Sequence, residues 1–281
     1  MFNSNSLRTS ILVSFLLFSS LVQAAVPDEN LVRRWDNGEG EGGDASGASA
    51  GGGGKAQVIT KCSVSGTVAL TFDDGPYNYL NDAVDELKKA GAKATFFFNG
   101  NNWGCIYDDA NVQRVKYAYD NGFQIASHTW AHKDLKSLSR EDLTSEFTRT
   151  QDAIEKITGV KVAYTRPPYG NYNDLVLQVA YEQGQTLVNW DFDSGDSVGV
   201  AASDQKARYD KIVQEHPETI LSLEHEVHDT SIYDVLPYAI QKLQKAGYKL
   251  VTLAECLGTQ PYHNETSNAK GKGKDESWTC S

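Results

Sequence analysis

The sequence predicts an α/β protein built on a parallel β-sheet. Short runs of apolar and β-branched residues alternate along the chain with longer segments of helical periodicity. The short runs are mostly apolar instead of alternating between apolar and polar residues, which is typical of strands covered by helices on both faces. After the first 54 residues, the remaining chain is long enough for one domain with a single large core.

The expected elements follow one another as strand and helix. We expect strands at residues 68–72, 94–98, 123–126, 162–164, 186–190, 221–225 and 249–253. The first helix has Leu80, Val84 and Leu87 on one face and is stopped by Gly91, while Ser139 resembles the N-cap of a later helix. Other helices are expected near 109–119, 173–183, 203–214 and 231–245.

The most informative segment is Thr71–Pro76, where two adjacent aspartates follow the first expected strand. Neighbouring side chains of an extended chain point to opposite sides, so Asp73 and Asp74 can serve different purposes. One carboxylate can hold a metal ion while the other faces a substrate or water. Because Asp-Gly is also common in ordinary turns, this segment alone leaves a solvated turn equally open.

Two histidines, His128 and His132, lie four residues apart after the expected strand at 123–126. Taken alone, such a pair is more often an incidental surface feature than a metal site. Combined with one aspartate of the first segment, it gives an Asp-His-His set that suits a divalent metal ion such as Zn²⁺ with an open position for water. A closed structural zinc site would use cysteines, and none lies near these segments.

Three further polar segments follow expected strands: Arg166–Gly170, Asp191–Asp196 and Leu223–His225. Each also has an ordinary interpretation, as a proline turn, an acidic loop or a surface histidine. Five such clusters, each directly after a strand, favour one shared site, because parallel strands bring their carboxyl ends to the same face of a barrel or sheet.

These five segments resemble the motifs of the polysaccharide deacetylases, the NodB-homology domain of carbohydrate esterase family four. The resemblance extends from about Cys62 to Gly258, and the motifs come in the family's order. Within the family, the chain is most similar to the secreted fungal chitin deacetylases. The resemblance implies an irregular (β/α) barrel and a metal-dependent hydrolysis of N-acetyl groups in chitin or its oligomers, which gives chitosan and acetate.

The resemblance also implies a role for each residue around the metal ion. The ligands would be Asp74, His128 and His132, and the ion Zn²⁺, Co²⁺ or another divalent metal. Asp73 would be the general base that takes a proton from water. Arg166 would orient Asp73 and keep it ionised, because a nearby cation favours the carboxylate.

The remaining implied roles concern the leaving group and the substrate. His225 would protonate the leaving amine, and Asp196 would pair with His225 and raise its pKa. The backbone N–H of Tyr169 would hold the oxyanion, while Leu223 would line the acetyl pocket. Tyr169 and Trp130 would offer flat faces to sugar rings, with packing in the core an equal alternative for Trp130.

Two positions depart from the family pattern. The fourth motif usually ends in Asp-Trp, with the Trp as a wall of the acetyl pocket, but Ser197 follows Asp196 in this chain. The fifth motif usually reads Leu-x-His-Asp, but Glu226 follows His225. The first change predicts a wider acyl pocket, unless another side chain such as Trp190 fills the gap.

The two ends of the chain indicate a secreted protein. Residues 1–24 have the charged start, apolar run and small-residue exit of a signal peptide, and 25–36 would be a pro-segment if Arg33-Arg34 is a processing site. Residues 37–54 form a glycine-rich flexible linker, 55–258 the catalytic domain and 259–281 a tail with a glycosylation sequon at Asn264. No apolar run ends the chain, which argues against a lipid anchor.

Four cysteines in a secreted chain favour two disulfides, for which three pairings exist. A sheet closed into a barrel, as the resemblance implies, would bring Cys62 to Cys256, and this leaves Cys105 for Cys280. The formal net charge of -11 argues against nucleic acid or an anionic membrane as partner. We expect a monomer that acts on a neutral polymer.

Two other functions are compatible with the sequence. The same chemistry would serve acetylated xylan or the N-acetylglucosamine of peptidoglycan. Alternatively, the chain would be a sugar-binding protein with decayed catalysis, although such decay normally removes metal ligands first and the expected ligands are all present.

Overall fold

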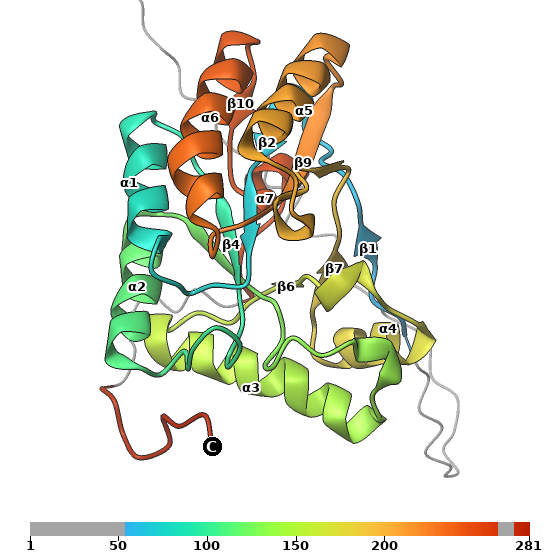
Figure 1. The fold of residues 1–281 in the computed structure, drawn as a ribbon. Helices are drawn as coiled ribbons and strands as arrows, with labels where there is room; N and C mark the ends of the chain where they lie inside the picture. The colour runs from blue at the N-terminus through green and yellow to red at the C-terminus, as the bar shows by residue number, and fades with distance from the viewer. Residues whose placement is uncertain (1–53, 264–272) are drawn as a thin grey trace, which may run out of the picture. The chain divides into compact units, whose positions relative to one another are not determined.

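The structure is a computed structural model that describes residues 54–263 and 273–281 (Figure 1). The expected signal peptide, the pro-segment, all but the last residue of the linker, and Asn264 lie outside the described residues. In the described ranges, no helix has both the length and the apolar character needed to cross a membrane.

Ten short strands of the described chain form one sheet, and every pairing in it is parallel. The strands are β1 (Val58–Ile59), β2 (Thr67–Ala69), β3 (Thr71–Asp73), β4 (Thr95–Phe98), β5 (Gln124–Ser127), β6 (Tyr164–Thr165), β7 (Thr186–Val188), β8 (Phe192–Asp193), β9 (Thr219–His225) and β10 (Lys249–Leu250). Their order is β1-β7-β6-β5-β4-β3-β9-β2-β10, with β8 paired to β9. The predicted α/β class is confirmed, and the sheet has two ends, because β1 and β10 are not paired with each other in the described residues.

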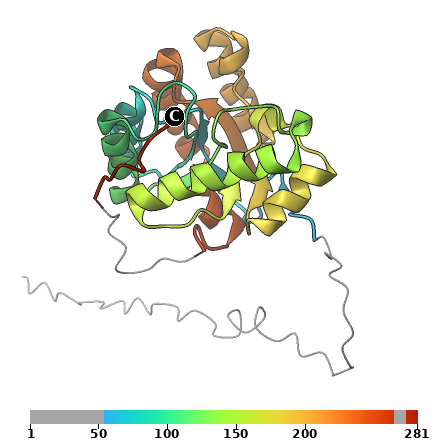
Figure 2. The same cartoon turned by 90° about the horizontal axis from the view of Figure 1, so that it is seen from below.

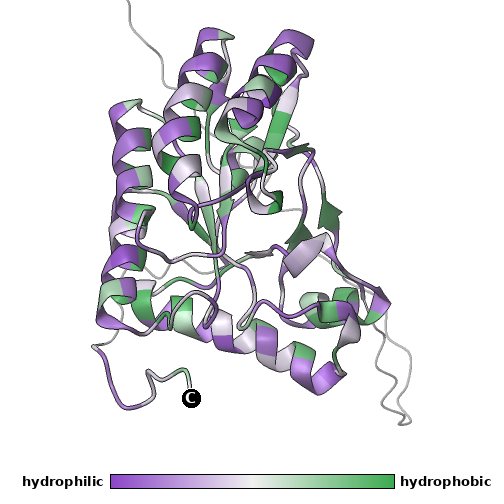
Figure 3. Ribbon diagram, in the orientation of Figure 1, coloured by the Kyte–Doolittle hydropathy of each residue, from purple (hydrophilic) through white to green (hydrophobic). Residues whose placement is uncertain are grey.

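Helices surround the sheet as a succession of neighbours. The α-helices are α1 (Leu80–Lys89), α2 (Asp109–Asp120), α3 (Arg140–Thr158), α4 (Asp174–Glu182), α5 (Ala202–Glu215), α6 (Leu236–Lys245) and α7 (Leu253–Leu257), and the shorter turns are η2 (Leu135–Ser137), η3 (Pro168–Gly170), η4 (Asp196–Val198) and η5 (Ser231–Val235). Neighbouring helices pack in the order α5, α6, α1, α2, α3, α4 (Figures 1 and 2). Their outward faces are mainly hydrophilic, while the strands beneath are mainly hydrophobic (Figure 3).

One expected element is wrong in its second half. The last strand was expected at 249–253, but β10 contains only Lys249–Leu250. Thr252 and Glu255 form a capping box, in which each side chain accepts the backbone N–H of the other residue, and this box starts α7. The Thr-x-x-Glu pattern is a helix-start signal that outweighs the strand preference of the residues before it.

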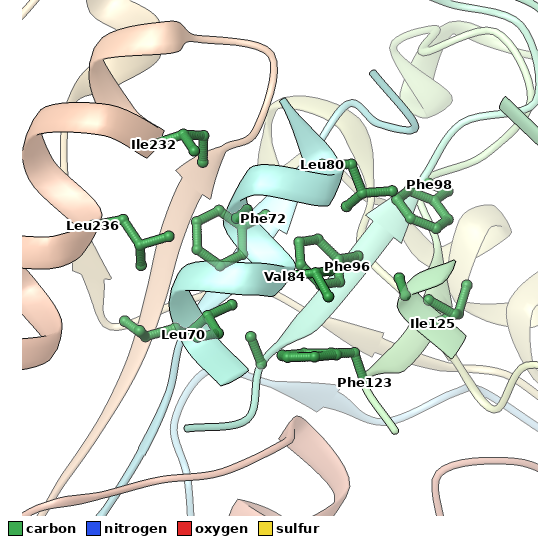
Figure 4. Close-up of a cluster of buried hydrophobic side chains, with 14 of the residues drawn as sticks. Leu70, Phe72, Leu80, Val84, Phe96, Phe98, Phe123, Ile125, Ile232 and Leu236 are labelled. Carbon is green, nitrogen blue, oxygen red and sulfur yellow. The ribbon is translucent and has the colours of Figure 1, made fainter. Parts of the chain in front are cut away.

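Side chains of the central strands alternate between two hydrophobic clusters. On β4, Phe96 and Phe98 belong to the outer cluster beneath the helices, whereas Phe97 belongs to an inner cluster enclosed by the sheet. Figure 4 shows the outer cluster, in which Phe72 of β3 lies close to Phe96. Because successive strand residues point to opposite faces, the residue after Phe72, Asp73, faces the inner side together with Phe97. The strand pleat therefore directs Asp73 towards the interior of the sheet.

Two disulfides join segments that are far apart in the sequence. Cys62 pairs with Cys256, and Cys105 pairs with Cys280, with Cα–Cα distances of 5.2 and 5.8 Å. This is the pairing favoured above. The second disulfide attaches residues 273–281 to the loop before α2, where the Trp278 ring packs 5.4 Å from that of Tyr107.

Candidate active site

The two adjacent aspartates separate at the end of β3. Asp73 is the last residue of the strand, and its side chain is buried. Asp74 follows with a φ of 73°, in the left-handed region that few non-glycine residues adopt, and its side chain stays partly exposed. One carboxylate is therefore enclosed by protein, while the other lies at the surface of the site.

Three donor atoms gather around Asp74. Its Oδ1 is 3.6 Å from Nε2 of His128 and 3.4 Å from Nε2 of His132. One donor atom from each of the three side chains lies within 4.8 Å of the others. His132 also has a left-handed φ, of 51°, so an unusual backbone conformation occurs at two of the three residues.

The imidazole of His128 is prepared to act as a ligand. Its Nδ1 lies 2.8 Å from the backbone carbonyl of Arg166, which accepts a hydrogen bond from it, and this leaves Nε2 directed at Asp74 as an acceptor. Burial lowers the pKa of His128 to about 3, so the ring is neutral at ordinary pH. A neutral imidazole fixed by its second nitrogen is the form that binds metal ions. The residues present therefore fit a divalent metal ion.

Asp73 is held by a buried arginine. The Arg166 guanidinium donates from Nη1 to Oδ1 of Asp73 at 2.9 Å and to Oγ1 of Thr71 at 2.6 Å, and it stacks 4.3 Å from the ring of Phe97. Burial raises the pKa of Asp73 above its ordinary value, while the charge and hydrogen bond of Arg166 oppose this shift. Arg166 therefore lowers the pKa of Asp73 as expected, but the opposing effect of burial is larger.

His225 forms a buried pair with Asp196. Its Nδ1 lies 2.8 Å from Oδ1 of Asp196, and its backbone N–H donates to Oδ2 at 2.7 Å. Oδ2 also accepts a 2.8 Å hydrogen bond from the hydroxyl of Ser231. Burial alone would lower the pKa of His225, but the hydrogen bond and charge of Asp196 outweigh burial and raise it to about 9. The imidazole is therefore protonated at neutral pH.

The proposed oxyanion and pocket residues lie beside these groups. Tyr169 is in η3 with a φ of 59°, and its ring is 65% exposed and packs 4.8 Å from the ring of His132. Leu223 is buried on β9, two residues before His225 and on the same side of the strand. Both residues thus border the group formed by the ligands and His225.

Trp130 corrects one expectation. Its side chain is only 4% exposed and belongs to the outer hydrophobic cluster. Arg149 stacks on the indole ring at 4.0 Å, and a Cβ atom at Gly100 would collide with it. Trp130 therefore has no free face for a sugar ring, and the alternative of core packing is the one that the structure supports. The role at a sugar ring was implied by the family resemblance, which does not fix the direction of this side chain.

Ser197 is exposed in the middle of η4, directly after Asp196, and Val198 beside it is 74% exposed. Trp190 packs elsewhere: its ring lies 5.6 Å from the guanidinium of Arg166 and against Gly170. The indole therefore lies next to the turn that follows Arg166 and Pro167.

Several site neighbours could not be found from the sequence. Asn102 donates to Oδ1 of Asp74 at 3.3 Å, and the ring of Trp103 is 52% exposed and packs 5.4 Å from that of Tyr77. Ser231 contacts Asp196 from a separate turn, as described above. Thr71, which contacts Arg166, lies inside the first motif and so had a signal in the sequence, whereas Asn102, Trp103 and Ser231 are brought there by the fold.

This chain is similar in sequence to known polysaccharide deacetylases. A family model described as polysaccharide deacetylase matches residues 60–188. The chain is 37% identical over 207 residues to a chitin deacetylase of a Pestalotiopsis species, covering 72% of this chain and 67% of the relative. It is 32% identical over 208 residues to a chitin deacetylase of Colletotrichum lindemuthianum, covering 72% of this chain and 84% of the relative.

Two further comparisons concern substrate range and fold. A probable peptidoglycan-N-acetylglucosamine deacetylase of Arthroderma benhamiae is 38% identical over 208 residues, but the chain spans only 46% of its length. The solved structure of the chitin deacetylase from Colletotrichum lindemuthianum superimposes with a TM-score of 0.70 at 29% identity, covering 76% of this chain and 99% of that one. Sequence and fold agree, and the chain belongs to the polysaccharide deacetylase family.

Proposed function

We propose that this protein is a metal-dependent deacetylase that hydrolyses the N-acetyl groups of chitin or chitin oligomers, giving chitosan and acetate. The observation that carries the proposal is the pairing of β3 and β9. It places Asp73 directly opposite His225, with the donor atoms of Asp74, His128 and His132 beside Asp73. A base, an acid and a ligand set thus meet at one edge of the sheet.

Asp74, His128 and His132 would hold the ion, with Zn²⁺ as first choice and Co²⁺ as an alternative. When bound, the ion supplies a Lewis acid for the amide carbonyl and for the attacking water. Asp73 accepts the proton of that water. Arg166 fixes the Asp73 carboxylate through a charge-assisted hydrogen bond, and a divalent cation next to Asp73 favours its ionised form in the same direction.

His225 delivers a proton to the leaving amine. Its pKa of about 9 keeps the imidazole protonated, and Asp196 holds Nδ1, so that the other ring nitrogen serves the substrate. Amides depend on protonation of the leaving group more than esters do, because an amine anion is a far poorer leaving group than an alkoxide. This acid therefore favours an N-acetyl substrate over an acetylated xylan.

The backbone N–H of Tyr169 would stabilise the oxyanion, and Leu223 would contact the acetyl methyl group. The exposed rings of Tyr169 and Trp103 offer flat apolar faces for sugar rings. Chitin is preferred over peptidoglycan because two relatives that align with most of their length are chitin deacetylases. Peptidoglycan N-acetylglucosamine remains the second candidate, supported by the relative from Arthroderma benhamiae.

The rest of the chain completes the proposal. We place a signal peptide at residues 1–24, a pro-segment at 25–36, a linker at 37–54, the catalytic domain at 55–258 and a tail at 259–281. The two disulfides suit an oxidising extracellular or cell-wall location. The protein would act as a monomer, glycosylated at Asn264.

Acetate release from chitin oligomers, with and without a chelator, tests the proposal. The proposal is supported if chelation abolishes acetate release and added Zn²⁺ restores it. Release from acetylated xylan but not from chitin oligomers would identify an esterase. Binding of the oligomers without any release would identify a sugar-binding protein.

A further inference from the structure

Glu226, one of the two positions where the chain departs from its family, packs against the loop that follows Asp74. Its side chain is fully buried. Oε1 accepts a hydrogen bond from the backbone N–H of Tyr77 at 2.9 Å, and Tyr77 is the third residue after Asp74. A Cβ atom at Gly75 would collide with the same carboxyl group, so the loop lies directly on Glu226.

Glu146 has the same relation to the histidine loop. It lies on α3, and its side chain is buried. Oε2 accepts a hydrogen bond from the backbone N–H of Ala131 at 2.8 Å, and Ala131 directly precedes His132. On the other side of His132, the ammonium group of Lys133 lies 3.3 Å from Oε1. One carboxylate thus contacts the chain on both sides of a ligand.

Both loops have a backbone that needs such support. Asp74 and His132 adopt the left-handed region, with φ of 73° and 51°, and neither is a glycine. Non-glycine residues in this region are strained and keep the conformation only when surrounding contacts hold it. In each loop, a hydrogen bond to a buried glutamate lies within three residues of the strained ligand.

A purely structural role accounts poorly for Glu226. A buried carboxyl group is costly unless it is hydrogen-bonded, and an apolar side chain would fill the space with less cost. Within the described residues, Oε2 of Glu226 has no hydrogen-bond partner. The hydrogen bond that Oε1 accepts from the Tyr77 N–H is therefore the polar contact that accounts for a carboxyl group at this position. Burial raises the pKa of Glu226 well above its ordinary value, and a neutral carboxyl group still accepts this hydrogen bond.

We propose that Glu226 and Glu146 are positioning residues of the metal site, each of which fixes one ligand loop through a backbone N–H. Glu226 keeps Asp74 in place, and Glu146 keeps His132 in place. The ligands come from separate loops. If either loop is loosened, its donor atom moves away from the others and metal binding weakens. The inference rests on the proposed metal-dependent function.

The test compares leucine and glutamine variants at each position. Glu226→Leu and Glu146→Leu remove the acceptor, whereas Glu226→Gln and Glu146→Gln keep an amide oxygen in its place. We expect each leucine variant to bind Zn²⁺ about 10- to 100-fold more weakly, as is typical when a group that orients a ligand is lost. Both glutamine variants should bind within a few-fold of the wild type. With Co²⁺ bound, the visible absorption spectrum should change in the leucine variants alone.

Thr150→Val is the matched control, because Thr150 is buried one turn after Glu146 and its hydroxyl bonds to the backbone of its own helix. It should lower the melting temperature without changing the metal affinity. If a leucine variant does not fold, the alanine variant replaces it, since water can then satisfy the exposed N–H. The inference would be overturned if folded leucine or alanine variants, which lack the acceptor, bind Zn²⁺ as tightly as the wild type does. A wild type that binds no Zn²⁺ or Co²⁺ would instead overturn the proposed function, and the inference with it.

Discussion

Asp73 of β3 and His225 of β9 are direct partners in the register of two adjacent parallel strands. One belongs to a buried pair with Arg166 and the other to a buried pair with Asp196. The base and the acid of the proposed reaction are therefore spaced by the sheet itself, while the metal ligands come from the loops beyond it.

The metal ligands should be separable from the groups that only move protons. His128→Ala and His132→Ala should each weaken Zn²⁺ binding sharply, because each removes one of three donor atoms. Isothermal titration with Zn²⁺ measures this directly. As a control, His216→Ala removes a histidine at the C-terminal end of α5 that bonds to Ala246. Wild-type affinity in the His132 variant would exclude that residue from the ligand set.

The adjacent aspartates should differ in what they lose. Asp73→Asn should keep the metal ion but lower kcat on the order of a hundredfold or more, the usual contribution of a general base. Asp74→Asn should instead reduce metal binding. Metal content and kcat, measured on the same samples, distinguish the two. Equal loss of metal in both variants would show that this division of roles is wrong.

The pKa of His225 predicts how activity and stability depend on pH. Because the imidazole must be protonated to act as an acid, kcat should fall as pH rises through about 9. Asp196→Asn removes the charge that raises this pKa most, so the fall in kcat should move to lower pH. The stability gained from the raised pKa is fully present below pH 6.5 and is lost as pH rises to about 9. Profiles of kcat and of melting temperature against pH measure both effects, and an unmoved alkaline limb in Asp196→Asn would contradict the assignment.

The serine at position 197 should widen acyl specificity. A tryptophan there would place a large flat face against the acetyl group, whereas Ser197 is small and exposed. We expect the ratio of kcat/KM for N-propionyl over N-acetyl chitin oligomers to be higher in the wild type than in Ser197→Trp. Trp190→Phe is the matched comparison, because Trp190 packs against Gly170 near Arg166. The same ratio in the wild type and in Ser197→Trp would mean that residue 197 does not shape the pocket.

Much of the site could be predicted because its main residues directly follow strands. The order of strands and motifs alone brings Asp74, His128 and His225 to one edge. The direction of a side chain in a loop is different, since it depends on packing between distant segments. Trp130 lies between two proposed ligands in sequence, yet it points into the outer cluster, where Gly100 leaves room for its ring and Arg149 stacks on it.

The residues that contact the site from other elements could not be predicted from the sequence for a related reason. Ser231, Asn102 and Glu146 carry no motif, and each reaches the site from an element that the local sequence describes only as a turn or a helix. Helices and strands were largely predictable because apolar periodicity is a local signal. The error at 249–253 arose where two local signals compete, the strand preference of the residues before Thr252 and the capping box with Glu255.

The Cys105–Cys280 disulfide makes substrate binding depend on whether the protein was produced under oxidising conditions. Cys105 lies three residues after Asn102, which contacts Asp74, and two after the exposed Trp103. Protein produced in a reducing cytoplasm would lack this bond, leaving the loop to its backbone hydrogen bonds, such as Asn101 to Trp130 and Ile106 to Gly100. Preparations of identical sequence that differ in the oxidation state of Cys105 and Cys280 would then differ in their affinity for a sugar chain. Free-thiol content should accompany every rate reported for this enzyme.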